Sequence, residues 1–415
     1  MNASFTASAL HPAFDVIFLG GGPAGYVGAI RAAQLGLSVG VIEREGLGGT
    51  CVLWGCIPAK ALLEAASLAT KVKHAAEFGV NVGEVKLDFG VAMKRSRDVS
   101  NKNSKGVELN KITWIKGTGT LGAGKTVPVT ADGKSDTHTA TKGVVISTGS
   151  RVRGLPQAGL ELNKTTVISS DEALILEKAP KTIAIVGAGA VGCEFADVFA
   201  AFGSKVTLIE VMVGAKMTAA QVGKSSVKLS IEAGGALTDR GFIKINERME
   251  TSAKGVYAIG DVAGPPMLAH KGEREGMIVA DVIAGKKFHP LNYGNVPNAT
   301  YCHPEVASIG LTEAQVKEKK IDYKVGKFPF SASGRARTSG ETEGFVKIIR
   351  DSKSGGILSA HIVGAHATEL IHELAVAREN EFTVEEIDLA IHAHPTLSGA
   401  VAEAALDSMG RMIHA

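Results

Sequence analysis

The chain has 415 residues, of which 45% are hydrophobic and 5% are aromatic. This length predicts about two to four domains, and the hydrophobic content is enough for several packed cores. The 45 basic and 42 acidic residues leave a formal charge of only +3, and no basic block gathers on one segment. Neither nucleic acid nor an anionic membrane surface is therefore indicated as a partner.

The lack of a recognisable targeting signal and the small number of cysteines predict a protein from the interior of a cell. No run reaches the ~18 apolar residues of a membrane span, so we expect a soluble protein. Residues 1–14 lack the basic start and apolar core of a secretory signal and the arginines of a mitochondrial presequence. We expect a cytoplasmic protein of bacterial type, or a mitochondrial matrix protein if a presequence has been removed. Four cysteines without a signal favour a reducing compartment, where a closely spaced pair is more often catalytic than structural.

The first predicted elements are a strand, a glycine-rich turn and a helix. Residues 15–19 form a short apolar run typical of a buried parallel strand, and Gly-Gly-Gly-Pro-Ala-Gly follows at 20–25. A helix is predicted over 26–35 and a second strand over 38–42. This strand ends at Glu43, about twenty residues beyond the first glycine, as dinucleotide-binding units require.

The glycines and the acid of this unit each have a physical role in holding a dinucleotide. Gly20 permits the tight turn, and Gly22 lets the backbone approach a pyrophosphate. Gly25 allows the helix to pack closely, and Glu43 can hold a ribose diol. We therefore predict a dinucleotide site here.

Two cysteines lie close together in residues 48–60, GGTCVLWGCIPAK, which continue into an alanine-rich apolar helix. Residues five apart project about 140° away from each other in a straight helix, whereas a disulfide needs Cα atoms within roughly 4.4 to 6.8 Å. A bridge between Cys51 and Cys56 therefore requires a bent entry turn, which Gly55 permits, while Pro58 is tolerated in a first helical turn. A helix N-terminus also stabilises a thiolate, so a redox-active dithiol is the sharper interpretation.

Two plainer interpretations of the cysteine pair remain. A zinc site needs a second pair of ligands, but Cys193 and Cys302 are isolated and distant in the sequence, so no metal is predicted. A buried pair of free thiols is the stronger alternative.

The pattern of strand, glycine turn, helix, strand and acid recurs over 182–210, after a predicted strand and turn at 143–150 and a linker at 151–155. Its turn is Gly-Ala-Gly-Ala-Val-Gly at 187–192, and its terminal acid is Glu210. Two such units predict two dinucleotides between which electrons pass. No arginine follows Glu210, which favours a free ribose 2′-hydroxyl and hence NAD over NADP.

The last third of the chain changes character. Residues 255–261 predict a strand that ends in Gly-Asp, where Asp261 is either a cofactor ligand or an ordinary helix cap. From 292 onward, predicted strands at 323–328, 344–349 and 356–363 and predicted helices at 312–319, 367–379 and 384–390 indicate an α+β domain with an antiparallel sheet. The domain ends in a histidine pair, His392 and His394, which alone is more often structural than catalytic.

These motifs occur in the order of one family. The chain resembles the flavoprotein disulfide reductases with two dinucleotide folds, and among them the dihydrolipoamide dehydrogenase (E3) family. The resemblance covers about residues 14 to 409 and is carried by residues 20–25, 48–60, 148–150, 187–194, 260–261, 267–270, 303–306 and 392–398. Glutathione reductase is similar and remains the alternative within the class, but Ile-Pro-Ala-Lys-Ala-Leu-Leu after Cys56 favours the lipoamide enzyme.

The resemblance implies a fold and a domain order. The fold class is α/β, with two Rossmann-like dinucleotide-binding domains and a C-terminal α+β dimerisation domain. An FAD domain is expected at 1–150 and 255–291, an NAD domain at 151–254 and the dimerisation domain at 292–415. The implied activity is oxidation of dihydrolipoamide by NAD⁺, in a homodimer that serves the lipoyl domain of a 2-oxo acid dehydrogenase complex.

The resemblance also implies the roles of individual residues. Cys51 exchanges with the substrate dithiol, Cys56 lies against the flavin as the charge-transfer thiolate, and His394 is the acid/base delivered from the partner subunit. Lys60 and Glu194 pair near the flavin. The implied FAD and NAD contacts are Gly20, Gly22, Gly25, Glu43, Gly49, Thr50, Lys60, Gly117, Thr148, Gly149, Ser150, Gly187, Gly189, Gly192, Glu194, Glu210, Gly260, Asp261, Met267, Leu268, Ala269 and His270.

The chain departs from the family in several places. Gly399 stands where the family has a glutamate, and Val-Leu-Trp at 52–54 differs from the usual residues. The segment from Glu210 to the strand at 255 is short, with strands predicted only at 227–231 and 242–245, and residues 96–109 are also shortened. A second hypothesis follows, in which the chain is a folded FAD-binding homodimer with little NAD-linked activity that acts as a scaffold or partner.

Overall fold

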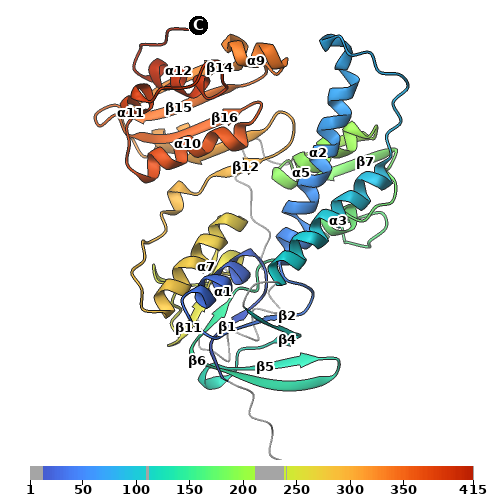
Figure 1. Cartoon of the computed structure of the whole chain (residues 1–415), viewed down its shortest axis with the longest axis vertical. Coiled ribbons are helices and arrows are strands. Elements are labelled where there is room, and N and C mark those ends of the chain that lie inside the picture. The colour runs from blue at the N-terminus through green and yellow to red at the C-terminus, as the bar shows by residue number, and fades with distance from the viewer. Residues whose placement is uncertain (1–12, 109–111, 211–237, 240, 415) are drawn as a thin grey trace, which may run out of the picture. The chain divides into compact units, whose positions relative to one another are not determined.

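The computed structural model describes residues 13–108, 112–210, 238–239 and 241–414 (Figure 1). They divide into two compact units, each described here by itself. The first unit takes residues within 1–58, 94–175 and 218–291, and the second takes residues within 59–93, 176–217 and 292–415. The division into FAD, NAD and dimerisation domains stays a prediction.

The first unit is built on a seven-stranded sheet. Its strands are β1 (Phe14–Leu19), β2 (Val39–Glu43), β3 (Thr113–Lys116), β4 (Thr118–Gly119), β5 (Thr126–Ala131), β6 (Lys134–Ile146) and β11 (Val256–Ala258). Strands β3, β2, β1, β6 and β11 run parallel. Strand β5 pairs antiparallel with the first part of β6, and β4 pairs antiparallel with β5. The long β6 therefore belongs to both parts, because its last residues lie between β1 and β11.

Both faces of β1 are buried, as its continuous apolar sequence predicts. Val16 and Phe18 belong to a core on one face of the sheet, and Ile17 and Leu19 belong to a core on the other. Helices α1 (Pro23–Gln34) and α7 (Ala269–Ile283) lie side by side and cover the first of these faces (Figure 1). The strands and helices predicted around the first glycine turn are confirmed.

The second unit contains an antiparallel sheet of order β12-β13-β16-β15-β14. Its strands are β12 (Asn298–Thr300), β13 (Val306–Gly310), β14 (Tyr323–Pro329), β15 (Phe345–Asp351) and β16 (Ile357–Val363), and its helices are α8 (Glu313–Glu318), α9 (Gly334–Ser339), α10 (Ala367–Glu379), α11 (Val384–Leu389) and α12 (Gly399–Ser408). Helix α12 packs on β14 and β15, and α10 packs on β13 and β16. The six elements predicted between 312 and 390 are confirmed, each within two residues at either end.

The second glycine turn lies between β7 (Thr182–Val186) and α5 (Ala190–Ala201), and β8 (Lys205–Ile209) pairs parallel with β7. Among the described residues no third strand joins this sheet. Apolar side chains on it remain exposed, as shown by Val186 at 44% and Leu208 at 40%. Of the two strands predicted beyond Glu210, 227–231 lies outside the described residues, and the other is found as β10 (Phe242–Ile243), paired with β9 (Thr238–Asp239) in the first unit.

Two further helices, α2 (Cys56–Lys73) and α3 (Phe89–Glu108), carry residues of both units, and a short α4 (Ser170–Ala173) belongs to the first. The helical stretch Thr50–Lys73 is long and apolar enough, by length and composition, to cross a membrane. The expectation that no such run exists is therefore wrong. Buried helices of globular proteins meet the same criterion, and this one has Lys60 paired with a carboxylate and Lys73 bonded to a carbonyl. We therefore interpret it as a packed helix.

A deeply buried ion pair of the first unit joins Lys271 and Glu275 on α7, whose side chains are 0% and 1% exposed. The ammonium also donates to the carbonyls of Gly260 and Gly264, and the carboxylate accepts from the amide of Gly260 at 2.6 Å. The pair therefore holds the loop that follows β11.

Replacing Lys271 leaves a buried carboxylate without its counter-ion, so Lys271→Met is expected to lower the free energy of unfolding by about 3–5 kcal/mol. Urea denaturation of the two proteins measures the difference. The control is Arg31→Met, which breaks the Arg31–Asp281 pair between α1 and α7, with side chains 39% and 18% exposed; such a pair contributes about 0–1 kcal/mol. Equal effects of the two changes contradict the prediction.

Candidate redox and dinucleotide-binding sites

Cys51 and Cys56 form a disulfide, with Cα atoms 4.7 Å apart. The bend that the sequence predicts is present, because residues Thr50–Trp54 form a π-helical turn and regular helix begins only at Cys56. Gly55 lies at the junction with φ −148° and ψ −108°. The disulfide favours a redox-active pair over a pair of free thiols. No metal-binding cluster occurs among the described residues.

Helix α3 holds the main chain around this disulfide. Ser96, Ser100 and Ser104 follow one another at a spacing of four, so they share one face of the helix. They donate to the carbonyls of Pro58 at 2.8 Å, Val52 at 2.6 Å and Leu47 at 2.6 Å, respectively. All three serines are buried. The carbonyls of the bent turn thus find donors on α3, as buried backbone groups require.

The first glycine turn has the shape of a phosphate-binding cradle. Gly20 has φ +107°, and a Cβ on Gly25 would lie 2.0 Å from the carbonyl oxygen of Gly20, so only glycine allows α1 to begin this close to the turn. No side chain caps the N-terminus of α1, which leaves its first amides for an anion. The Glu43 carboxylate accepts from the amide of Gly21 at 2.9 Å.

The second glycine turn repeats this geometry. Gly187 has φ +104°, and a Cβ on Gly192 would lie 1.9 Å from the carbonyl oxygen of Gly187. The Glu210 carboxylate accepts from the amide of Ala188 at 2.9 Å, as Glu43 does in the first turn. The two predicted repeats are therefore equivalent in their local structure.

The end of β6 and the loop after β11 come together in the first unit. Ser150 donates to the Asp261 carboxylate at 2.5 Å. Asp261 lies inside a short 3₁₀ turn whose N-cap is Ile259, so the helix-cap interpretation of Asp261 is wrong. The hydroxyl of Thr148 is buried and has no hydrogen-bond partner among the described residues.

The remaining predicted contacts lie on turns and helix starts. Thr50 belongs to the π-helical turn, Gly189 is the N-cap of α5, and Leu268 is the N-cap of α7. Positive φ angles occur at Gly49, Gly117, Gly149 and Gly260, while Met267, Ala269 and His270 surround the start of α7. Their contacts with a cofactor stay predictions.

Lys60 and Glu194 are paired, as the resemblance implies. The ammonium lies 2.8 and 2.9 Å from the two carboxylate oxygens, and the Glu194 side chain is only 5% exposed. Tyr301, which the sequence did not single out, adds two contacts. Its amide donates to Glu194 at 3.2 Å, and its ring lies 4.4 Å below the Lys60 ammonium. Lys60 is therefore held by a carboxylate and by an aromatic face.

The two C-terminal histidines differ in their surroundings. His392 contacts Glu373 through Nε2 at 2.8 Å and the carbonyl of Ala390 through Nδ1 at 2.9 Å, so both its nitrogens are engaged. His394 is exposed and has no hydrogen-bond partner among the described residues. Of these two histidines, His394 is therefore the one whose ring nitrogens are available to a substrate.

Glu403, one helical turn beyond Gly399, cannot support His394. It is 8% exposed and accepts from the ring of His414 at 2.6 Å and from the amides of Ile413 and His414. Burial raises the pKa of Glu403, but these hydrogen bonds outweigh it and the net pKa is lowered.

Cys193 and Cys302 are free thiols. Their sulfurs lie 3.3 Å from the carbonyl of Ala188 and 3.4 Å from that of Pro304. Burial raises the pKa of both thiols, that of Cys302 to about 11. At neutral pH both are protonated and poorly nucleophilic, unlike a catalytic cysteine.

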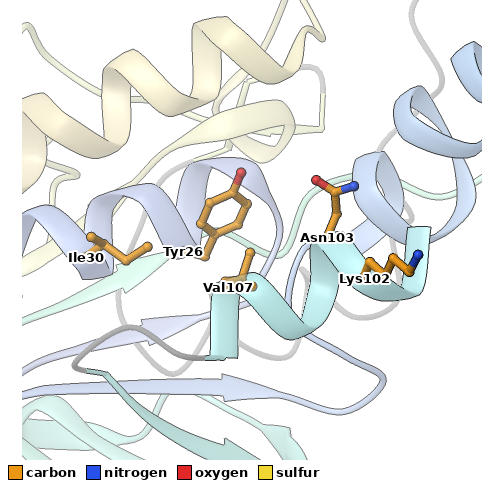
Figure 2. A pocket seen from close by; sticks show the side chains of 6 residues that line it. Tyr26, Ile30, Lys102, Asn103 and Val107 are labelled. Carbon is orange, nitrogen blue, oxygen red and sulfur yellow. The ribbon is translucent and has the colours of Figure 1, made fainter. Parts of the chain in front are cut away.

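A hollow of about 410 Å³ lies between α1 and α3 of the first unit (Figure 2). It is lined by Tyr26, Ile30, Lys102, Asn103, Gly106 and Val107. Burial and the nearby Glu273 raise the pKa of the Tyr26 phenol. None of these residues is a predicted site residue.

Comparison with known proteins identifies the family. The family described as pyridine nucleotide-disulphide oxidoreductase matches residues 14–222 and 212–276, and its dimerisation domain matches residues 296–405. The chain belongs to the pyridine nucleotide-disulphide oxidoreductases. The predicted fold class, two dinucleotide-binding units and a C-terminal dimerisation domain, is confirmed.

Similar proteins of known name cover nearly the whole chain. The dihydrolipoyl dehydrogenase of Rhizobium etli is 39% identical over 97% of this chain and 99% of its own length, and that of Corynebacterium glutamicum is 40% identical over the same shares. The mitochondrial enzyme of Pisum sativum is 37% identical over 96% of this chain and 92% of its own length. LpdA from Mycobacterium tuberculosis has the same fold, with a TM-score of 0.84 at 24% identity over 94% of this chain and 98% of its own.

The comparisons also bear on the predicted shortening. The alignment with the Rhizobium etli protein extends over 481 positions, whereas this chain has 415 residues. Several tens of residues of that relative therefore have no counterpart here.

Restoring a carboxylate at position 399 is expected to raise turnover of dihydrolipoamide if His394 is the acid/base. A Cβ on Gly399 meets no atom within 4 Å, so Gly399→Glu is sterically allowed. A hydrogen bond to a charged group contributes about 1.5–3 kcal/mol, which corresponds to at most about a 10- to 100-fold gain in rate. Steady-state kinetics of Gly399→Glu against wild type measures it.

Gly399→Ala is the control, because it changes helix propensity without adding a carboxylate. An equal gain from both substitutions refutes the role of the carboxylate. If neither Gly399→Glu nor His394→Ala changes turnover, the assignment of His394 is wrong.

Proposed function

We propose that this chain is a dihydrolipoyl dehydrogenase, a homodimeric flavoprotein that oxidises dihydrolipoamide to lipoamide with NAD⁺. The Cys51–Cys56 disulfide at the bent start of α2 carries the proposal, because it is the group that a substrate dithiol can reduce. Full-length relatives named dihydrolipoyl dehydrogenase supply the substrate class.

The cysteine chemistry balances without a further reactant. A substrate thiolate attacks the sulfur of Cys51, a mixed disulfide forms, and Cys56 leaves as a thiolate. His394 takes the proton of the second substrate thiol, which then attacks the mixed disulfide and closes the lipoyl ring as Cys51 departs. The dithiol loses two electrons and two protons, the first proton to solvent when the attacking thiolate forms and the second to His394. The protein then holds the reduced pair, with Cys56 as a thiolate and Cys51 as a thiolate that His394 can protonate.

The residues present fit the two cofactors. The cradle around Gly20 to Gly25, with Glu43 and the unpartnered hydroxyl of Thr148, fits FAD. The turn at 187–192, with Glu210, fits the adenosine and pyrophosphate part of NAD. When bound, FAD and NAD⁺ accept the electron pair from the reduced cysteines.

The partners follow from the family and from the substrate. The dimerisation domain supports a homodimer, in which we propose that His394 of one subunit serves the disulfide of the other. The lipoyl domain of a 2-oxo acid dehydrogenase complex is the proposed macromolecular partner. Relatives include bacterial and mitochondrial proteins, and either the bacterial cytoplasm or the mitochondrial matrix suits the reaction.

A second candidate function is favoured by one observation. The sheet that carries the second glycine turn has only two strands among the described residues. A complete nucleotide-binding half contains further βαβ units of about 30 residues each. A homodimer that binds FAD but has little NAD-linked activity, and serves as a scaffold or partner, is therefore the alternative.

The purified protein is expected to be yellow, and anaerobic dihydrolipoamide is expected to produce a long-wavelength absorbance band. Cys56→Ser should abolish this band, because the substrate can then no longer generate the thiolate. Cys193→Ser is the matched control and should leave the band unchanged. A colourless protein, or a band that is indifferent to Cys56→Ser, refutes the assignment of the dithiol.

Affinity for NAD is expected to be weakened, since the turn at 187–192 holds only part of the nucleotide. Reduction of an artificial acceptor by NADH should be slow, with a raised KM, while reduction of the same acceptor by dihydrolipoamide proceeds without this limit. Comparing the two donors on one preparation separates the NAD site from the cysteine site. Ordinary NADH kinetics would show that the shortened segment is not needed.

A further inference from the structure

Trp54 and Arg97 form a contact at the redox turn that the proposed reaction does not use. Trp54 lies between the two cysteines in the sequence, and the guanidinium of Arg97 is 4.7 Å from the centre of its ring. The same guanidinium donates to the carbonyl of Leu53. Arg97 thus contacts two neighbouring residues, Leu53 and Trp54, of the segment that separates Cys51 from Cys56 in the sequence.

The charge of Arg97 has no counter-ion in the part of the chain that the structure describes. Its partners there are a carbonyl and an aromatic face, and burial lowers the pKa of its guanidinium. Holding a cation in a partly buried place costs free energy unless an anion offsets it. Reduction of the neighbouring disulfide generates such an anion, because one of the two sulfurs is released as a thiolate.

Hydrogen bonds from α3 to the segment around the cysteines, here called the serine clamp, hold this charge in place. The clamp consists of the bonds that Ser96 and Ser100 donate. Ser96 and Ser100, on either side of Arg97 along α3, are both 0% exposed and donate to the carbonyls of Pro58 and Val52. Helix α3 is therefore hydrogen-bonded to the chain on both sides of Leu53 and Trp54, the two residues that Arg97 contacts. Leu53 and Trp54 thus lie in a segment whose carbonyls on either side, at Val52 and Pro58, are hydrogen-bonded to α3.

We propose that Arg97 is a positioning residue of the redox pair. It keeps a positive charge beside the segment between Cys51 and Cys56 and stabilises the thiolate formed on reduction. The inference rests on the redox role proposed for these cysteines. One molecule of a small dithiol converts the disulfide to a dithiol and itself becomes a cyclic disulfide, so the equilibrium can be measured without the natural substrate. A stabilised thiolate favours the reduced form.

The experiment uses the full chain as purified, in a Cys193→Ser/Cys302→Ser background so that only the redox pair is counted. The protein is equilibrated with dithiothreitol and its oxidised form in varied ratios, and thiols are counted by alkylation and mass spectrometry. Arg97→Met is expected to lower the equilibrium constant for reduction about tenfold, which corresponds to about 30 mV toward more reducing potentials. The pH at which the reduced pair alkylates at half its maximal rate should rise by about one unit.

Three variants separate charge from structure. Arg97→Lys keeps the charge and should recover most of the equilibrium constant, whereas Lys94→Met, at an exposed position of the same helix, should change nothing. Ser100→Ala loosens the clamp without removing a charge and should leave the pH of alkylation unchanged. If Arg97→Met does not fold, Arg97→Gln is measured in its place.

The outcomes distinguish this inference from the proposed function. Arg97→Met or Arg97→Gln with unchanged equilibrium constant and unchanged pH of alkylation overturns the inference while the redox pair stands. A shift by Ser100→Ala equal to that of Arg97→Met also overturns it, because the order of the turn and not the charge is then responsible. A parent protein whose Cys51–Cys56 bond resists dithiothreitol, with no thiols counted, removes the redox assignment itself.

Discussion

The bent start of helix α2 is the constraint on which the redox site depends. A disulfide between residues five apart is incompatible with a straight helix, so the chain replaces the first turn by a π-helical turn and a glycine. Carbonyl groups in this turn and on either side of it, those of Leu47, Val52, Leu53 and Pro58, accept from the serines and the arginine of α3. These bonds give the irregular segment the partners that buried backbone groups require.

The two glycine turns show which part of a nucleotide site is local. Both turns have a glycine with positive φ, a second glycine under the first carbonyl, and an acid whose carboxylate accepts from the turn. The same geometry occurs at the first turn, on a seven-stranded sheet, and at the second turn, on the two-stranded sheet of β7 and β8. The pyrophosphate cradle therefore needs only its own βαβ unit, whereas the remainder of the nucleotide depends on strands that lie farther along the chain.

The sequence predicts features that depend on neighbouring residues better than features that depend on distant parts of the chain. The glycine turns and helix α10 depend on neighbours in sequence, so their patterns identified them directly. The short strands β12 and β13 depend on pairing with distant partners and carry no periodic signal of their own. The pairing of Lys60 with Glu194 came from the resemblance, because the two residues lie far apart in the sequence.

Other features were visible in the sequence but were not interpreted. Serines at 96, 100 and 104 repeat at the helical spacing in a segment predicted to be shortened, and that repeat places three hydroxyls on one face. Lys271 and Glu275 show the spacing of a helical ion pair, yet only the packing of α7 reveals that the pair is buried. The apolar stretch that includes α2 was missed as a span-length segment because lysines interrupt it.

Three polar groups, near the first glycine turn, near the disulfide and on the C-terminal histidine pair, are incompletely paired within the described residues. Among the described residues, the hydroxyl of Thr148 is buried and unbonded beside the first glycine turn, and Arg97 has a carbonyl and a ring in place of an anion. His394 has an unengaged ring, while His392, two residues earlier, is fully bonded. For Thr148 and Arg97, which are buried or partly buried, an incompletely paired polar group costs free energy, whereas the exposed ring of His394 is open to water. The three groups lie at the dinucleotide turn, beside the disulfide and on the C-terminal histidine pair, which are the places where the proposed reaction brings a cofactor or a substrate.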